Sequence, residues 1–185
     1  MKHILFPTDF SENARNAIYY GLNLYGEKYS EYLVFNTFYI PYANSDVPVS
    51  MSDFMAQEAG KSFGDLLAII KKDFADKDFK IETDFRVGDV ATTANSIVKR
   101  KGIDIIIMGT QGATGIEEVL GGSQTSNVIK NTNCPVLAIP AMSRFTAPKK
   151  ILLAIDAENM DNLSEAAFAP LLEIVQKFKS EILVL

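Results

Sequence analysis

Cysteine and histidine are scarce in this chain of 185 residues, which has one of each, Cys134 and His3. A single cysteine cannot form a disulfide within the chain, and one thiol with one imidazole cannot supply a Cys/His zinc site. The sequence therefore excludes both an internal disulfide and a structural Cys/His zinc site. The scarcity of cysteine fits a reducing compartment, so we expect a cytoplasmic protein.

Positive charge and long apolar runs are also lacking. The chain has 23 acidic and 18 basic side chains, and its formal net charge is -5. An acidic chain has no general attraction for nucleic acid or anionic lipid, so we expect neither as a partner. No stretch approaches the roughly 20 apolar residues of a membrane span, and the apolar run before Pro7 and Asp9 is too short for a signal peptide. We expect a soluble protein without a leader or membrane anchor.

Two common nucleotide-binding motifs are absent. The sequence contains no G-x-x-x-x-G-K-[ST], which argues against a P-loop NTPase. The first apolar run leads into Asp9 rather than into G-x-G-x-x-G, which argues against a dinucleotide-binding Rossmann fold.

The sequence does contain a regular alternation of short apolar runs and helical patterns. Such an alternation predicts βαβ units around a parallel sheet. Right-handed crossovers then give a doubly wound α/β sheet with strand order 3-2-1-4-5. The predicted strands cover residues 3–8, 33–39, 80–87, 103–108 and 135–139.

Capping residues mark the helices between these strands. Ser11 and Asp89 are typical helix N-caps, and each precedes apolar residues at helical spacing. Gly102 follows the second helical pattern and can end the helix in the left-handed conformation. The sequence therefore predicts one helix after Ser11 and another from Asp89 to Lys101.

The chain contains part of an internal repeat. KKILLAID, at residues 149–156, parallels KHILFPTD, at residues 2–9, with Lys, Ile, Leu and Asp in the same four places. A helical pattern and a strand-like run, residues 182–185, follow the second segment. We therefore expect one complete domain over residues 1–143 and the first β-α-β of a second, truncated copy over residues 148–185. We also expect the natural polypeptide to continue beyond Leu185.

The segment that carries chemistry is GTQGATGIEEVLGGSQTSNVIKN, residues 109–131, between the fourth predicted strand and a helix. Its spaced glycines allow backbone amides to approach phosphate oxygens closely. Ser123 and Thr125 begin the helix, where unpaired amides and the helix dipole favour an anion. In an open α/β sheet this loop lies at the carboxyl edge, where ligands bind. The segment predicts a ligand that carries phosphate.

Asp9 ends the first predicted strand at the same edge of the sheet. Its carboxylate can accept hydrogen bonds from a ribose hydroxyl or an adenine amino group, or it can serve only as a turn or capping residue. Pro7 and Thr8 precede it and can wall a base pocket, although proline near a strand end needs no ligand to explain it. Both interpretations of these residues remain open at this point.

The sequence resembles the universal stress protein family. The family pattern G-x2-G-x9-G-[ST] is matched by Gly109, Gly112, Gly122 and Ser123, and FPTDFSENA, residues 6–14, resembles the family's opening. The resemblance implies a flavodoxin-like α/β sandwich that binds ATP or another adenine nucleotide, with or without Mg²⁺. It also implies a homo-oligomer, or intramolecular pairing of tandem domains, through the fifth strand.

The resemblance also implies a set of site residues. The adenosine would contact Pro7, Thr8, Asp9, Thr37 and Met108. The ribose and phosphates would contact Gly109, Gln111, Gly112, Gly122, Ser123, Gln124 and Thr125. No residue of this set is assigned to catalysis or to metal binding.

Three functions follow from these features. The leading expectation is an adenine nucleotide-binding module in stress response or signalling. The first alternative is a slow nucleotide hydrolase or an adenylyl-chemistry enzyme, although the loop lacks the cationic clamp that phosphoryl chemistry normally requires. The second alternative is an interaction scaffold with an empty site. We expect Cys134 to be a small buried hydrophobe, and His3 lies at the strand end opposite the site.

Overall fold

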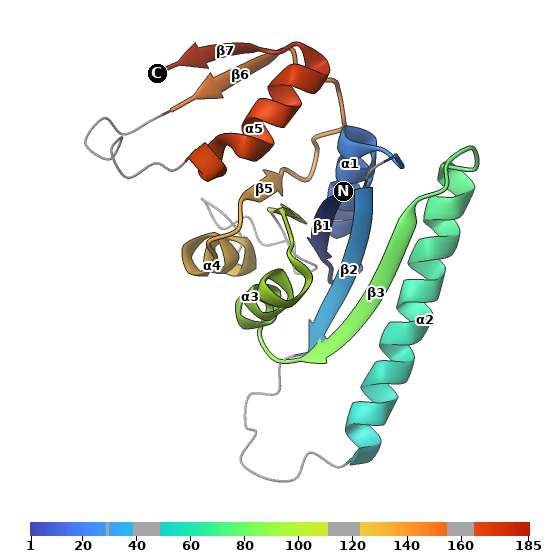
Figure 1. Cartoon of the computed structure of the whole chain (residues 1–185). Coiled ribbons are helices and arrows are strands. Elements are labelled where there is room, and N and C mark those ends of the chain that lie inside the picture. Colours follow the sequence, from blue (N-terminus) through green and yellow to red (C-terminus); the bar gives the residue numbers. More distant parts are fainter. Residues whose placement is uncertain (29, 39–48, 111–122, 155–164) are drawn as a thin grey trace. The chain divides into compact units, whose positions relative to one another are not determined.

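The computed structural model describes residues 1–28, 30–38, 49–110, 123–154 and 165–185 (Figure 1). The chain divides into two compact units, Met1–Arg144 and Phe145–Leu185, and each contains a parallel sheet of its own. None of the described helices is both long and apolar enough to cross a membrane.

The first unit is built on a five-stranded parallel sheet with the order β3-β2-β1-β4-β5, as predicted. Its central strand β1 pairs with β2 over its whole length and with β4 on its other side. β2 begins three residues earlier than the apolar pattern predicts, because Ser30 and Glu31 pair with Lys2 and His3. The strands are β1 (Lys2–Pro7), β2 (Ser30–Phe38), β3 (Lys80–Val87), β4 (Ile105–Gly109) and β5 (Val136–Ile139).

Within the described residues, four helices connect these strands. The predicted caps are confirmed, because the Ser11 hydroxyl accepts a hydrogen bond from the Ala14 amide at 3.2 Å and the Asp89 carboxylate accepts one from the Thr92 amide at 3.0 Å. Gly102 follows α3 with a φ of 63°, the left-handed conformation that favours glycine. The helices are α1 (Glu12–Tyr25), α2 (Val49–Asp73), α3 (Val90–Lys101) and α4 (Ser123–Asn131).

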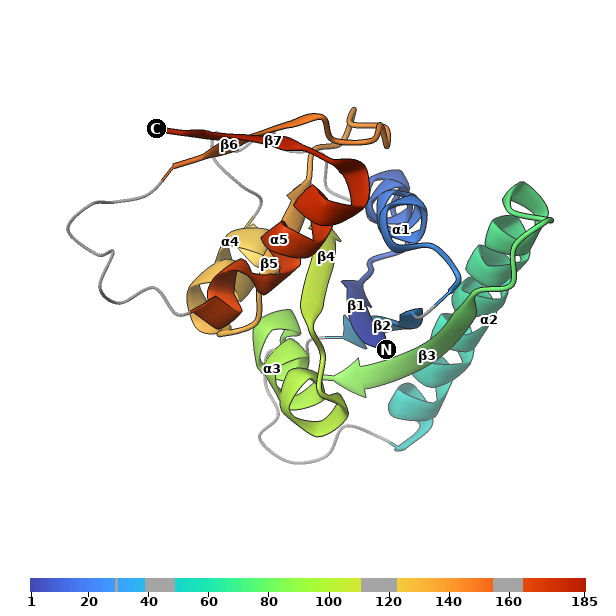
Figure 2. The same cartoon turned by 45° about the horizontal axis from the view of Figure 1, so that its top comes forward.

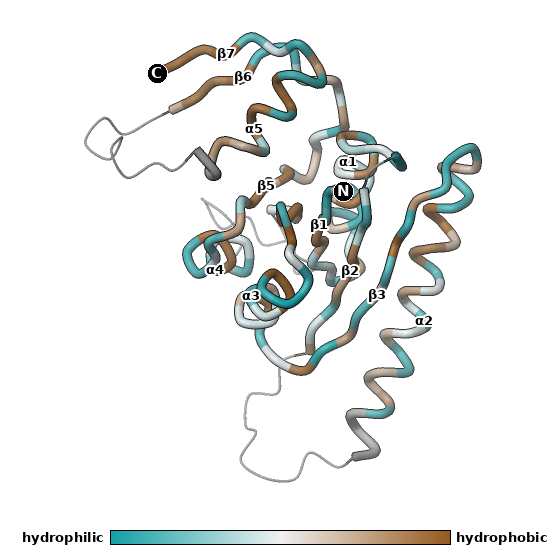
Figure 3. The backbone as a smooth tube through the Cα atoms, in the orientation of Figure 1, coloured by the Kyte–Doolittle hydropathy of each residue, from teal (hydrophilic) through white to brown (hydrophobic). Residues whose placement is uncertain are grey.

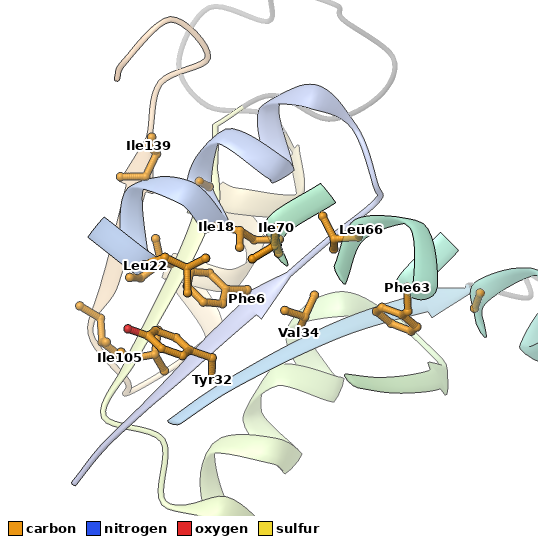
Figure 4. Packing of buried hydrophobic residues seen from close by; sticks show 14 residues of the cluster. Phe6, Ile18, Leu22, Tyr32, Val34, Phe63, Leu66, Ile70, Ile105 and Ile139 are labelled. Carbon is orange, nitrogen blue, oxygen red and sulfur yellow. The ribbon is translucent and has the colours of Figure 1, made fainter. Parts of the chain in front are cut away.

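The helices cover both faces of the sheet (Figure 2). α1 and α2 pack on one face, where Phe6 and Tyr32 stack with their ring centroids 5.7 Å apart (Figure 4). α3 and α4 pack on the other, where Ala91, Ala94 and Ile97 of α3 meet Leu5 and Leu33. Strands apolar on both faces thus lie at the centre of the sheet, as expected for a doubly wound fold.

α2 is amphipathic from Asp53 onward. Apolar and polar segments alternate along it in Figure 3, and Phe63, Leu66 and Ile70, at helical spacing, are buried. This stripe brings α2 onto the face of the sheet that α1 also covers.

The second unit is a β-α-β fragment of β6 (Lys150–Leu153), α5 (Glu165–Phe178) and β7 (Glu181–Val184). β6 and β7 are parallel, with Lys150 opposite Glu181 and Leu153 opposite Val184. Within this unit the rings of Phe145 and Phe178 lie 6.1 Å apart.

Candidate functional site

The carboxyl ends of β1, β2 and β4 meet at one edge of the first sheet. Pro7, the last residue of β1, is in register with Phe35 of β2, and β4 ends at Gly109 on the other side of β1. The start of α4 lies beside the end of β4, where the Thr125 hydroxyl donates a hydrogen bond to the Gly109 carbonyl at 2.7 Å. We call this edge, with the β1–α1 turn and the first turn of α4, the candidate site.

Thr8 is fixed in place directly after β1. Its amide donates to the Phe35 carbonyl at 2.9 Å, and its own carbonyl accepts a hydrogen bond from the Asn36 side chain at 2.7 Å. The Thr8 hydroxyl accepts the Phe10 amide at 3.0 Å, and the residue is 7% exposed. Thr8 therefore shapes the turn with its side chain, and its contacts tie β1 to the end of β2.

Asp9 is exposed at the tip of the same turn. One carboxylate oxygen accepts the Ser11 amide at 3.0 Å, and Ser11 in turn caps α1. Asp9 therefore does act as a turn residue, because its carboxylate makes this hydrogen bond within the turn. The same contact orients the carboxylate at the surface of the candidate site.

Phe10 has a φ of 62°, in the left-handed region that side-chain-bearing residues rarely adopt. Its ring packs edge-on against Phe63 of α2, with the ring centroids 5.1 Å apart and an interplanar angle of 74°. Such an edge-to-face pair is a favourable arrangement of aromatic rings. Phe10 therefore joins the β1–α1 turn to the core beneath α2.

Gly109 is a close contact point between β4 and α1. A Cβ atom on this residue would lie 2.5 Å from the Asn13 side-chain nitrogen, a distance that real Cβ atoms do not show. Thr125, which bonds to the Gly109 carbonyl, is 4% exposed. In the described residues, Gly109 and Thr125 therefore serve the packing of β4 against α1 and α4.

The model of the universal stress protein family matches residues 1–140. The chain belongs to this family. Among solved structures, protein MJ0577 of Methanocaldococcus jannaschii is 32% identical, with a TM-score of 0.60 over 75% of this chain and 95% of that one. The family model covers almost all of the first unit.

Two further solved universal stress proteins show the same fold at lower identity. One from Archaeoglobus fulgidus is 22% identical, with a TM-score of 0.69, and the match covers 98% of this chain and 64% of that one. One from Arabidopsis thaliana, described as having AMP bound, is 16% identical, with a TM-score of 0.50 over 90% of this chain and 99% of that one. At these identities the likeness concerns the fold alone.

The structure brings several of the predicted site residues of this universal stress protein to one edge. Pro7 and Met108 are buried at strand ends, Thr37 is half-buried near the end of β2, and Gln124 is exposed in the first turn of α4. Ser123 begins α4. Gln111, Gly112 and Gly122 lie outside the described residues.

Three residues that sequence reasoning missed support the candidate site. Asn36 holds the Thr8 carbonyl, Asn13 fills the space beside Gly109, and Phe10 links the turn to Phe63. Asn36 could have been singled out from the sequence, because it is a polar residue within the apolar run of β2. The roles of Asn13 and Phe10 depend on contacts between distant parts of the chain, which periodicity does not report.

The remaining reactive side chains of this universal stress protein lie elsewhere. His3, at the amino end of β1, is 3.5 Å from a Glu31 carboxylate oxygen and 3.8 Å from one of Asp104. Burial raises the pKa of the Cys134 thiol to about 11, which keeps it protonated near neutral pH. In the part of the chain that the structure describes, no group of His, Cys, Asp and Glu side chains could hold a metal ion.

Proposed function

We propose that this universal stress protein binds ATP or another adenine nucleotide at the candidate site, as a stress-response or signalling module. The observation that carries the proposal is the position of α4, whose first turn bonds to the end of β4 through Thr125 and Gly109. The glycine pattern spans that β4–α4 connection in the sequence. A helix N-terminus at the carboxyl edge of a parallel sheet is a favourable position for phosphate.

The neighbouring β1–α1 turn supports an adenosine end of the ligand. Asp9 presents a carboxylate that can accept hydrogen bonds from a ribose hydroxyl or an adenine amino group. The buried Pro7 and Met108 would contribute backbone and apolar surface, while Thr37 and Gln124 are accessible enough for direct contact. The AMP in the A. thaliana protein supports the capacity of this fold to hold an adenine nucleotide.

The proposed roles of Gly109 and Thr125 differ from direct phosphate contact. The Thr125 hydroxyl already donates to the Gly109 carbonyl, and Gly109 has Asn13 against its Cα. We infer that both residues place the start of α4 and leave direct phosphate contact to the amides of Gly112, Gly122 and Ser123. Mg²⁺, where present, would arrive with the nucleotide.

Binding without turnover is the preferred form of this function. Hydrolysis needs a positioned base or water and cationic stabilisation of the transferred phosphoryl group. The segment from Gly109 to Ser123 contains no Lys, Arg or His. A slow hydrolase remains the alternative, and release of inorganic phosphate from excess ATP at a rate above the protein-free control would support it.

The experiment that tests this function is mass spectrometry of the small molecules released when the purified protein is denatured. We expect an adenine nucleotide, in a molar ratio near that of the protein. Protein that carries no nucleotide and binds none of ATP, ADP and AMP in calorimetry would contradict the proposal and support an interaction scaffold.

We also propose that residues 148–185 are the start of a second copy of the domain in residues 1–143. The alignment of KKILLAID with KHILFPTD places Lys150 on His3. Lys150 is opposite Glu181 on the neighbouring strand, and His3 is opposite Glu31. A nitrogen-bearing side chain faces a glutamate carboxylate across the strands at both places, with nitrogen–oxygen distances of 3.8 Å for Lys150–Glu181 and 3.5 Å for His3–Glu31. The two β-α-β segments thus share one register as well as one sequence pattern.

The second unit has an exposed apolar face, which supports its association with another protein surface. Leu152 and Leu183 are 63% and 42% exposed, whereas their equivalents in the first unit, Leu5 and Leu33, are buried against α3. A small β-α-β fragment buries too little surface to be stable alone. We therefore propose that this face and the sheet edges support an oligomer or tandem pairing, with the fifth strand as the other pairing edge.

A further inference from the structure

The most unusual backbone conformation in the candidate site is that of Phe10, at a φ of 62°. Bulky side chains rarely occupy the left-handed region, and surrounding contacts must hold them there. Among the described residues, Lys179 is the other non-glycine with a positive φ, and it lies in the second unit. The first unit therefore has this strain at the turn between Asp9 and Ser11.

Contacts on both sides hold Phe10 in this conformation. Its amide donates to the Thr8 hydroxyl at 3.0 Å, and the next amide, of Ser11, donates to the Asp9 carboxylate at 3.0 Å. The ring is held by Phe63 of α2, which is 6% exposed and belongs to the main core cluster. The turn is therefore fixed by local hydrogen bonds and by packing of the Phe10 ring on the main core cluster, which includes its edge-on contact with Phe63 of α2.

We propose that Phe10 and Phe63 form an aromatic clamp that positions the Asp9 carboxylate for adenosine, so that α2 helps to set nucleotide affinity. The inference rests on the proposed nucleotide-binding function and assigns a part of it to residues that do not touch the ligand. Phe10 and Phe63 are positioning residues, and Asp9 is the contact residue.

The Phe10 conformation controls the Asp9 carboxylate because the two residues are adjacent in the β1–α1 turn. Asp9 and Ser11 flank Phe10, so rotation about the Phe10 backbone moves the Ser11 amide away from the Asp9 carboxylate. Without the Phe63 ring, Phe10 can relax toward a more common φ, and Asp9 samples several orientations. Ligand binding must then select one orientation, and the loss of that preorganisation weakens affinity.

Phe63→Ala in the full chain is the test variant, and Phe74→Ala is its matched control. Phe74 lies directly after α2 and packs edge-on against Tyr19 and Phe79 at 5.3 Å, on the same core cluster. Each variant removes one aromatic ring that packs in or against that cluster, but it is the Phe63 ring that contacts Phe10 of the β1–α1 turn. Phe63→Leu, which keeps most of the volume, replaces Phe63→Ala if the latter fails to fold.

The measurement is calorimetric Kd for AMP and for ATP, with thermal stability recorded in parallel. We expect Phe63→Ala to raise both Kd values about fivefold to tenfold, because both ligands share adenosine. Phe74→Ala should change them less than about twofold even though it lowers stability. In an Asp9→Ala background, Phe63→Ala should cause no further loss of affinity, since the clamp acts through that carboxylate.

The possible failures are distinguishable. A parent protein that binds neither nucleotide overturns the proposed function and this inference together. If the parent binds but Phe63→Ala leaves affinity unchanged, or weakens it as much as Phe74→Ala does, the clamp is structural alone and the inference is wrong. Additive losses from Asp9→Ala and Phe63→Ala also overturn it, and both of these results leave nucleotide binding in place.

Discussion

Single residues of the candidate site have two kinds of role. Asp9 and Gln124 are exposed at the sheet edge. Thr8 and Thr125 are buried, and their hydroxyls make hydrogen bonds with backbone groups. The hydroxyls of Thr8 and Thr125 therefore each have a structural role of their own. Under the proposed function, the exposed carboxylate of Asp9 is the side chain that we expect to contribute most to adenosine recognition.

We predict that Asp9→Ala weakens adenosine recognition and leaves the protein folded. A lost hydrogen bond to a carboxylate is worth about 1.5–3 kcal/mol, which is roughly a tenfold to hundredfold rise in Kd. Calorimetry with AMP measures the change, and circular dichroism checks the fold. Equal affinity in parent and variant would restrict Asp9 to its turn role.

Cys134 provides a second prediction at this scale. Burial raises the pKa of its thiol to about 11, and the thiolate is the reactive form. We expect the native protein to react with a disulfide reagent at pH 8 at least roughly a hundredfold more slowly than free cysteine does. Reaction in urea should be fast. Rapid labelling of the folded protein would contradict the buried, protonated state.

The helices and strands were largely predictable from the sequence, because apolar periodicity and caps report local structure. Ser11, Asp89 and Gly102 mark helix ends, and β4 and β5 begin within two residues of the predicted positions. The early start of β2 was missed because Ser30 and Glu31 are polar residues that pair with β1 at the sheet end. Contacts such as Gly109 with Asn13 were missed because they join elements distant in sequence.

Gly109→Ala tests this contact between β4 and α1. The new methyl group would lie 2.5 Å from the Asn13 side-chain nitrogen, so overpacking should destabilise the protein by about 1–3 kcal/mol. Denaturant unfolding measures the loss. In the background Asn13→Ala, which removes the side-chain contacts and leaves the Asn13 carbonyl 3.1 Å from the new methyl group, the same change should cost less. Full additivity of the two substitutions would show that the close contact is not the cause.

At the scale of the whole molecule, two units differ in how completely they are built. The first has both faces of its sheet covered by helices, whereas the second exposes Leu152 and Leu183. The family and the strand order could be inferred from the glycine pattern and the alternating elements. The sequence does not predict what would pack on these leucines in the proposed association, because an exposed apolar face does not identify its partner.

We predict that deletion of the chain after Ser143 changes the oligomeric state, that is, the number of chains per particle in solution. We expect nucleotide binding to stay intact. The cut keeps the Ser143 carbonyl, which accepts a hydrogen bond from Asn16 at 2.8 Å, so the first unit retains this contact. Light scattering gives the mass, and calorimetry gives the affinity. A truncated protein with the parent's oligomeric state and no nucleotide affinity would reverse both expectations.

The central claim is that the β4–α4 connection holds the phosphates of an adenine nucleotide. The most direct measurement is calorimetry of ATP with the parent, with Gly122→Val and with the control Gly64→Val, whose site on α2 has open space for a side chain. A branched side chain within the glycine pattern blocks close approach of phosphate to the backbone. We predict that affinity falls at least about tenfold in folded Gly122→Val and is unchanged in Gly64→Val. Parental ATP affinity in folded Gly122→Val would contradict the claim.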